Sequence, residues 1–241
     1  MSDKMNLELN LRHLTRVEGH GNLRINVKQG VLERATLDIV ESPRFFEAML
    51  QGRRWDELAQ ITCRICGICS VGHTTASLRA TEAALGVTPS EQTILLRKLM
   101  LHLEFLQSHV LHVYFLAAPD YFGVGSVFPL VETHKDVVLR ALRMKKCAND
   151  CCARIAGRHV HPIAMVVNGF SRLPTPADLA AVRADLRIAL EDARETVALF
   201  ATLSPPAFTR ETEYISLRKD DEYALYDGPI YTSNGRRVPV A

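Results

Sequence analysis

The 241-residue sequence lacks several features that would assign it to a class at once. It has no apolar run long enough to span a bilayer, because even the richest segment, 95–118, is interrupted by polar and charged side chains. Its net charge is only +2, so composition points neither to nucleic acid nor to an acidic surface. The N-terminus has no apolar signal core, and the chain contains no repeats. We therefore expect a globular cytoplasmic protein without a transmembrane segment or a nucleic-acid partner.

Cysteine is scarce, and its placement is uneven. In a chain without a signal peptide, the six cysteines are better interpreted as thiols or metal ligands than as disulfides. Cys66 and Cys69 form a Cys-x-x-Cys pair, with Arg64 before it and His73 after it. The segment 74–85 predicts a helix, whose N-terminal dipole, together with Arg64, would favour thiolates. Buried thiols or a structural zinc half-site can have the same spacing, so spacing alone leaves the chemistry open.

The N-terminal region carries strand signals. Residues 23–27 and 31–40 alternate apolar and polar side chains around a turn at 28–30, which predicts a β-hairpin with one buried face. Glu18 lies just before the first strand, next to Gly19. One interpretation is a solvated charge at the end of a strand. The other is a proton carrier whose pKa is raised in a partly desolvated site.

A short helix is predicted to begin at Pro43, with Ser42 as its N-cap. Arg44 and Glu47 are three residues apart and share a face. By default they form a surface ion pair. If that face points inward, Glu47 becomes a candidate ligand for a hard cation such as magnesium.

The rest of the chain is dominated by helical periodicity. A short helix is expected over 55–61, and long helices over 90–117, 130–155 and 178–203, followed by short strands and turns over 204–241. The fold class is therefore α+β, mainly α, with a small sheet packed on a bundle of long helices. We expect two regions, 1–203 and 204–241.

Histidines and cysteines also occur inside the long helices. His102, His109 and His112 each suit a satisfied core histidine better than a ligand, although the last two share a face. Cys147 and Cys151, four residues apart, could share a metal, but buried thiols acting as small hydrophobic residues are the favoured interpretation.

Several motifs in order carry a resemblance to a known family. They are Thr15-Arg16-Val17-Glu18-Gly19-His20, Arg44-Phe45-Phe46-Glu47, Arg64-Ile65-Cys66-Gly67-Ile68-Cys69 with His73, His109-x-x-His112 leading to Asp120, and Gly157-Arg158-His159-Val160-His161-Pro162. With these motifs the chain resembles the N-terminal portion of the large subunit of nickel–iron hydrogenases, in the cytoplasmic, cofactor-coupled branch. The resemblance implies an incomplete large-subunit fold.

The resemblance also implies roles for particular residues. Cys66 would be a terminal nickel ligand and Cys69 a bridge between nickel and iron, with cyanide and carbon monoxide completing the iron. Glu18 would relay protons, and Glu47 would bind magnesium. Three further residues would surround the metal site: Arg64, His73 and Asp120. Hydrogen would be split heterolytically, and electrons would leave through an iron–sulfur small subunit.

The chain departs from the family pattern in one respect. The family uses a second cysteine pair, in an Asp-Pro-Cys-x-x-Cys motif, and no cysteine follows Cys152. Cys63, Cys147, Cys151 and Cys152 are not in that motif, so their roles stay open. We expect a split or truncated subunit that is inactive alone and is completed by a separate polypeptide with the second pair. Diaphorase subunits linked to NAD(P) or ferredoxin are further possible partners. The alternatives are a non-catalytic structural homologue in an electron-transfer complex and a zinc-binding interaction module.

Overall fold

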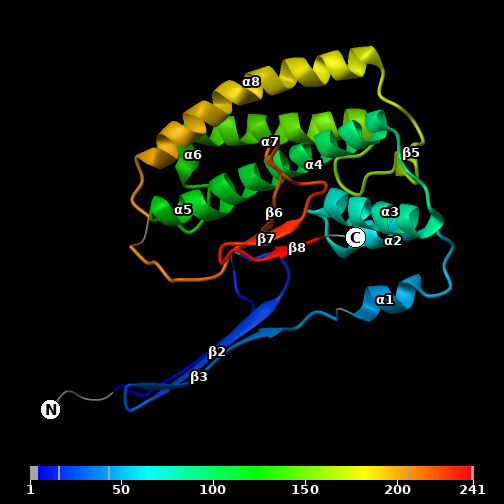
Figure 1. Cartoon of the computed structure of the whole chain (residues 1–241). Helices are drawn as coiled ribbons and strands as arrows, with labels where there is room; N and C mark the ends of the chain where they lie inside the picture. Colours follow the sequence, from blue (N-terminus) through cyan, green and yellow to red (C-terminus); the bar gives the residue numbers. More distant parts are fainter. Residues whose placement is uncertain (1–4, 16, 43, 206, 240–241) are drawn as a thin grey trace. The chain divides into compact units, whose positions relative to one another are not determined.

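The computed structural model describes residues 5–15, 17–42, 44–205 and 207–239. The chain divides into two compact units, residues 1–51 and 52–241. The first holds a three-stranded sheet and one short helix, and the second holds the long helices with two small antiparallel sheets (Figure 1). This is the mixed, mainly helical fold that the sequence predicts. The predicted division after residue 203 stays a prediction.

The sheet of the first unit extends the predicted hairpin by one strand. β1 (Leu7–Leu11), β2 (Gly21–Lys28) and β3 (Val31–Ile39) pair antiparallel in the order β1-β2-β3. Gln29 and Gly30 have φ of 48° and 78°, which are the two left-handed residues that a type I′ hairpin turn requires. β1 was not predicted, although its leucines alternate with polar residues as in the other strands.

The prediction of one buried face on this sheet is wrong for β3. Leu32, Leu37 and Ile39 are 60%, 60% and 67% exposed. A single-layer sheet seals an apolar face only when another element covers it. The helix of the first unit, α1 (Arg44–Leu50), is short and buries none of its described residues. It therefore does not cover the apolar face of the sheet.

The helix α1 matches the one predicted at this place. Pro43, its expected first residue, lies outside the described residues. Glu47 is exposed, and no ion pair joins it to Arg44 within the described part of the chain, so the default interpretation of that pair is wrong. The packing of this unit against the helices stays a prediction.

The second unit contains all the long helices. In order, it contains α2 (Leu58–Thr62), a 3₁₀ turn (Cys63–Ile65), α3 (Ser70–Leu85), α4 (Glu91–Leu111), a π-helical segment (His112–Ala117), α5 (Ala118–Tyr121), α6 (Leu130–Thr133), α7 (Lys135–Ala156) and α8 (Pro176–Ala201). Several boundaries differ from prediction: α3 begins at Ser70 rather than at 74, and α8 spans Pro176–Ala201 rather than 178–203. The first short helix begins at Leu58 rather than Trp55, and the helix expected over 130–155 is broken at His134. Among the described helices, none has both the length and the apolar character needed to cross a bilayer.

The end of α4 also differs from a simple helix stop. The predicted terminus near residue 117 is a π-helical segment that leads into α5, with Pro119 in the first turn of α5. Proline has no N–H for the bond to the fourth preceding carbonyl, and a wider turn accommodates that loss. His102, His109 and His112 are exposed, so the interpretation as core histidines is wrong.

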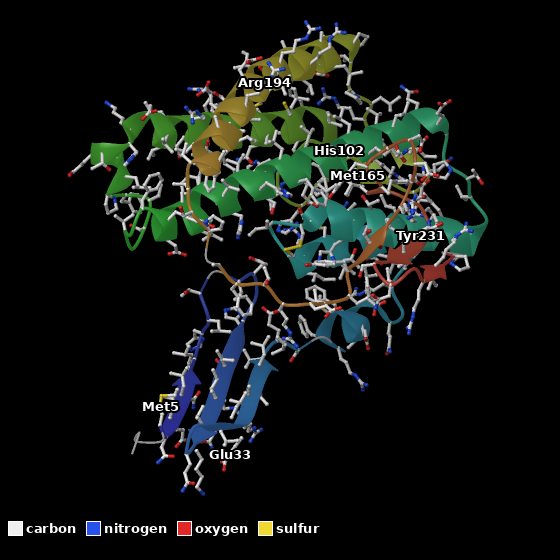
Figure 2. All side chains as sticks on the ribbon, turned by 60° about the vertical axis from the view of Figure 1, so that its left-hand side comes forward. Met5, Glu33, His102, Met165, Arg194 and Tyr231 are labelled. Carbon is white, nitrogen blue, oxygen red and sulfur yellow. A yellow bond between two sulfur atoms is a disulfide. The ribbon has the colours of Figure 1, made fainter. Side chains whose placement is uncertain are left out.

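Helix α4 is central to this unit and packs against α7 and α3, while α8 packs on α7 (Figure 1). The main core cluster contains Leu78, Met100, Leu103, Ile155 and Met165, each at most 2% exposed; Figure 2 labels Met165 inside this unit. Cys151 and Cys152 are fully buried in the same cluster, and burial raises the pKa of each thiol to about 12. Cys151 therefore acts as a small hydrophobic residue, as predicted, and Cys152 does the same, whereas Cys147, included in the same prediction, is only half-buried.

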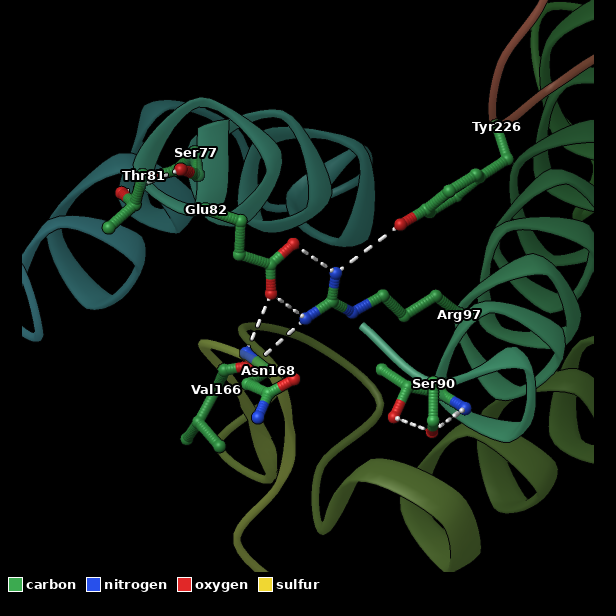
Figure 3. A network of polar contacts seen from close by, with 9 residues as sticks. Ser77, Thr81, Glu82, Ser90, Arg97, Val166, Asn168 and Tyr226 are labelled. Atoms are coloured by element: carbon green, nitrogen blue, oxygen red, sulfur yellow. Dashed lines mark hydrogen bonds and ion pairs between the residues drawn. The ribbon is translucent and has the colours of Figure 1, made fainter. Parts of the chain in front are cut away.

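A buried ion pair joins α3 to α4 (Figure 3). Arg97 is fully buried and its guanidinium donates to both carboxylate oxygens of Glu82, at 2.8 and 2.6 Å. It also donates to the hydroxyl of Tyr226 at 3.3 Å and to the carbonyl of Val166 at 2.9 Å, while the amide of Asn168 donates to Glu82 at 2.7 Å. The pair therefore links four separate segments of the second unit.

Val166 belongs to one of the two small sheets, and Tyr226 lies in the loop between two strands of the other. β4 (Met165–Val166) and β5 (Gly169–Phe170) form a hairpin between α7 and α8, and β6 (Ile215–Leu217), β7 (Ile230–Thr232) and β8 (Arg237–Val238) form the last sheet. The ammonium of Lys98 donates to both oxygens of Glu222 at 2.7 Å, which fixes the segment before β7 to α4.

Candidate metal centre

The Cys-x-x-Cys pair lies where a 3₁₀ turn meets a helix. Cys66 follows the 3₁₀ turn with extended backbone (φ −148°, ψ 134°), and Cys69 is the N-cap of α3. Gly67 is exposed between them, so the chain reverses direction without a side chain in the turn. The amide of Cys69 donates to the sulfur of Cys66 at 3.2 Å. The predicted position of the pair at a helix N-terminus is confirmed.

His73 completes a compact group with the two sulfurs. One ligand atom from each of Cys66, Cys69 and His73 lies within 4.8 Å of the others. Cys66 is buried, His73 is half-buried and Cys69 is exposed, so the group opens to one side. Burial lowers the pKa of His73, which favours the neutral imidazole that can bind a metal.

The sulfurs of Cys66 and Cys69 are joined as a disulfide, drawn as a yellow bond in Figure 2. The sulfurs of Cys66 and Cys69 lie in contact and the other four cysteines are free, as expected for the latter; the role of the pair as metal-binding thiols stays a prediction. The cause of the contact is local, because the turn sets the two Cα atoms 5.5 Å apart, within the usual range for a disulfide. In a metal site the same sulfur positions would be taken by two thiolates, so metal binding requires the reduced pair.

The reduced group suits a soft or borderline metal, because two thiolates and a neutral imidazole are the donors such ions prefer. It provides only half of a four-thiolate set. Cys63 is fully buried and its thiol donates to the carbonyl of Gln60 at 3.2 Å, and the remaining cysteines lie on α7. Within the described residues, the one metal-sized group of three or more donors is Cys66, Cys69 and His73.

The basic turn at 157–162 packs beside the cysteine turn. The amide of His161 donates to the hydroxyl of Ser70 at 3.0 Å, and its Nδ1 lies 2.8 Å from the carbonyl oxygen of Cys63. Because a carbonyl only accepts, Nδ1 carries the proton in this contact. His161 has φ of 55°, a left-handed conformation that is uncommon outside glycine. Hydrogen bonds therefore join the basic turn at 157–162 to the cysteine turn, although the two are far apart in sequence.

A buried carboxylate lies directly behind the same turn. Glu104 of α4 is 6% exposed, and its two oxygens accept from the amides of Val71 at 2.5 Å and Gly72 at 2.9 Å. Burial raises the pKa of Glu104 to about 7, while these two hydrogen bonds act in the opposite direction. In the sequence, Glu104 is one of the charged side chains that interrupt the apolar segment 95–118, with no role predicted for it. The available signal was a carboxylate at a position facing the core within a strongly apolar helix.

The other predicted residues lie on several elements. Arg64 is exposed in the 3₁₀ turn beside the cysteines, and Asp120 is exposed on α5. Glu18 precedes β2 and Glu47 lies on α1, so both belong to the first unit. Within the described residues, the two cysteines and His73 form one group, and Arg64 comes two residues before it in the chain. The roles of Glu18, Glu47 and Asp120 stay predictions.

Comparisons with known proteins agree with these observations. Residues 44–134 match the family model described as nickel-dependent hydrogenase. The α subunit of sulfhydrogenase 2 of Pyrococcus furiosus is 37% identical over 194 residues, which cover 80% of this chain and 47% of that protein. The α subunit of sulfhydrogenase 1 of the same organism is 33% identical over 235 residues, covering 97% of this chain and 55% of that protein.

The fold is similar to that of a solved hydrogenase. A crystal structure of an NAD⁺-reducing [NiFe]-hydrogenase in the H₂-reduced state superimposes with a TM-score of 0.86 at 28% identity, covering 96% of this chain and 55% of that one. The chain spans about half the length of the curated relatives it matches. On this sequence and structural similarity, the chain belongs to the nickel-dependent hydrogenase family, in which it corresponds to a portion of a nickel–iron hydrogenase large subunit.

Proposed function

We propose that this chain supplies the two-cysteine half of the hydrogen-activating centre of a nickel–iron hydrogenase. The observation that carries the proposal is the group formed by Cys66, Cys69 and His73 at the start of α3. Two sulfurs that are already adjacent need no backbone rearrangement to act as paired thiolate ligands after reduction. The names of the relatives, sulfhydrogenase and NAD⁺-reducing [NiFe]-hydrogenase, support the reaction class.

In this proposal Cys66 and Cys69 would hold the metals, Cys66 as a ligand of nickel and Cys69 as a ligand shared by nickel and iron. When bound, the centre, with cyanide and carbon monoxide on its iron, supplies heterolytic cleavage of H₂ or the reverse reaction. The Sγ atom of Cys66 accepts the proton, and the carboxylate of Glu18 carries it onward. The positive charge of Arg64, close to the pair in sequence, favours the ionised form of the sulfurs, and His73 lies beside them. Asp120 provides a further polar group over the site.

Several components come from outside the described site. The second thiolate pair comes from another polypeptide or from the remainder of a longer chain, since two thiolates do not complete a four-thiolate centre. Electrons leave to an iron–sulfur small subunit and, through it, to diaphorase subunits linked to NAD(P) or ferredoxin. Glu47 binds magnesium, a cation that prefers carboxylate oxygens. The assembly operates in the cytoplasm.

Metal analysis of the intact native complex tests the central claim. We expect stoichiometric nickel, together with infrared bands from iron-bound cyanide and carbon monoxide. Cys66→Ser and Cys69→Ser should each remove the nickel, because a hydroxyl is a poor ligand for it. Cys147→Ser, a half-buried cysteine on α7, is the matched control and should retain it. Nickel that persists in both site variants, or native complex that lacks nickel, would refute the proposal.

A second experiment isolates the proton carrier. Glu18→Gln keeps the shape of the side chain and removes the titrating group, so hydrogen turnover and hydrogen/deuterium exchange should fall by about 10²–10⁴-fold, the usual contribution of a positioned acid or base. The nickel content should be unchanged. Exchange at the wild-type rate in this variant would show that Glu18 is not the relay.

A further inference from the structure

A helix normally satisfies its first free amides with its own N-cap side chain. The N-cap oxygen of Ser, Thr, Asp or Asn accepts from the amide two or three residues further on. The N-cap of α3 is Cys69, and its side chain makes no capping hydrogen bond. Elsewhere in this chain the local solution is used, because Thr175 caps α8 by accepting from the amide of Asp178 at 3.1 Å.

In α3 the capping bonds come from another helix instead. The two oxygens of Glu104 accept from the amides of Val71 and Gly72, which lie 33 and 32 residues away in sequence and are the second and third residues of α3. These are the amides that an N-cap side chain at position 69 would bind. Because both oxygens accept from N–H groups, the ionised carboxylate is the form that fits this geometry.

The neighbouring polar groups are also occupied without the sulfur of Cys69. The amide of Cys69 donates to the sulfur of Cys66, and the amide of His73 donates to the carbonyl of Cys69 at 3.2 Å. The hydroxyl of Ser70 accepts from the amide of His161. Among these described contacts, no backbone amide of the first turn of α3 donates a hydrogen bond to the sulfur of Cys69.

We propose that Glu104 is a positioning residue for the metal site: it replaces the N-cap side chain of α3 and so leaves the sulfur of Cys69 available as a ligand. This inference rests on the proposed function. Burying a carboxylate disfavours the folded state, whereas a Ser or Asp at position 69 would cap the helix locally without that penalty. The cysteine at the N-cap and the buried carboxylate have complementary roles. Glu104 fixes the turn to α4, and the sulfur of Cys69 is then free to bind the metal.

The test uses the reduced full chain, Ni²⁺ as the probe, and Glu104→Gln as the main variant. Glutamine has the same size but one acceptor oxygen, so one of the two amides of α3 loses its partner. Glu104→Asp keeps the charge but is one methylene shorter, so it cannot reach both amides. The matched control is Glu91→Gln. Glu91 is an exposed carboxylate in the first turn of α4, the helix that also carries Glu104. Circular dichroism checks that every variant is folded.

Two readouts are compared. Amide hydrogen exchange over residues 70–73 in the metal-free chain reports the cap, and the absorbance of nickel–thiolate charge transfer reports ligand placement. We expect Glu104→Gln and Glu104→Asp to accelerate exchange locally and to weaken Ni²⁺ binding by about 10- to 100-fold, the usual effect of losing a group that orients a ligand. Glu91→Gln should change neither.

Three results would overturn the inference. Unchanged exchange in both Glu104 variants would show that the carboxylate does not cap α3. Faster exchange with unchanged Ni²⁺ affinity would reduce Glu104 to a structural cap. Faster exchange in a protein whose wild type binds no Ni²⁺ would overturn the link between this cap and a nickel ligand at Cys69, while the proposed function is tested separately by metal analysis of the native complex. The exchange measurement separates this last failure from the first.

Discussion

Arg97 is the most deeply buried charged residue of the described chain, and its replacement by Met should be strongly destabilising. The methionine keeps much of the apolar volume but leaves Glu82, 3% exposed, with only the amide of Asn168 as a partner. Removing one member of a buried ion pair typically lowers the free energy of unfolding by about 3–5 kcal/mol, because the other charge stays buried and unpaired. The carbonyl of Val166 and the hydroxyl of Tyr226 lose a donor as well.

The measurement is urea-induced unfolding of the full chain, followed by circular dichroism with the slopes compared between variants. Lys146→Met is the matched control, because Lys146 pairs with Asp150 on the exposed face of α7 with a side chain that is 76% exposed. Exposed pairs of this spacing contribute little to stability. The double variant Glu82→Gln/Arg97→Met removes both charges and should be more stable than Arg97→Met alone. The glutamine oxygen can still accept from Asn168.

Two outcomes would contradict this reasoning. If Arg97→Met changed the free energy of unfolding no more than Lys146→Met does, the buried pair would not be holding its segments together. The free energy of unfolding of the double variant is compared with that of Arg97→Met. If it is lower by as much as Glu82→Gln alone lowers that of the wild type, the two side chains are not coupled.

Three further predictions follow from the same unit. Because burial raises the pKa of Glu104 from its ordinary 4.5 to about 7, the folded chain holds this proton more tightly than the unfolded chain; stability should therefore fall by about 3 kcal/mol as pH rises from ~4.5 to ~7. Glu104→Gln should abolish that part of the pH dependence in urea titrations, and an unchanged slope would contradict the assignment. The denatured, unreduced chain should show four reactive thiols, since Cys66 and Cys69 are paired, and six after reduction; six without reductant would disprove the pairing. Gly157→Ala should lower the melting temperature more than Gly86→Ala: both glycines end helices at positive φ, which disfavours a side chain by about 1–2 kcal/mol, but only at Gly157 would the new Cβ lie 3.0 Å from a side-chain atom of Ile163. Equal melting temperatures would show that Ile163 moves aside freely.

Much of the fold could be predicted because its signals are local. Ser90 caps α4 by accepting from the amide of Thr93 at 3.3 Å, so this helix start was visible in the sequence. The capping box at Thr175 is an equally local signal, although it starts α8 at Pro176, two residues before the predicted start. The π-helical segment before Pro119 was not visible, because it depends on how the chain adjusts to a missing amide. The exposed face of β3 was also missed, since alternation reports that a face is apolar but not whether another element covers it.

The candidate site could be predicted only for residues whose type carries the chemistry. Cys66, Cys69 and His73 were found because thiol and imidazole groups at this spacing suggest ligands, and the structure places them in one group. Glu104 was missed because its role depends on the register between α3 and α4, a contact across more than thirty residues. A carboxylate in an apolar helix was the only local sign, and that sign does not say which group the carboxylate faces.

The features that oppose stability lie close together around the cysteine turn. Glu104 is a buried carboxylate, His161 holds a left-handed backbone beside Cys63, and the N-cap of α3 is a residue that does not cap. Each breaks a local rule of helix or core formation, whereas α8 keeps the ordinary local cap at Thr175. Natural sequences tolerate such conflicts mainly where function requires them, because strained or desolvated groups are otherwise easily replaced. A merely structural disulfide at Cys66–Cys69 would need neither a buried carboxylate nor a strained histidine. Two sulfurs held for a metal would need both, because ligand geometry has to be fixed before the metal binds.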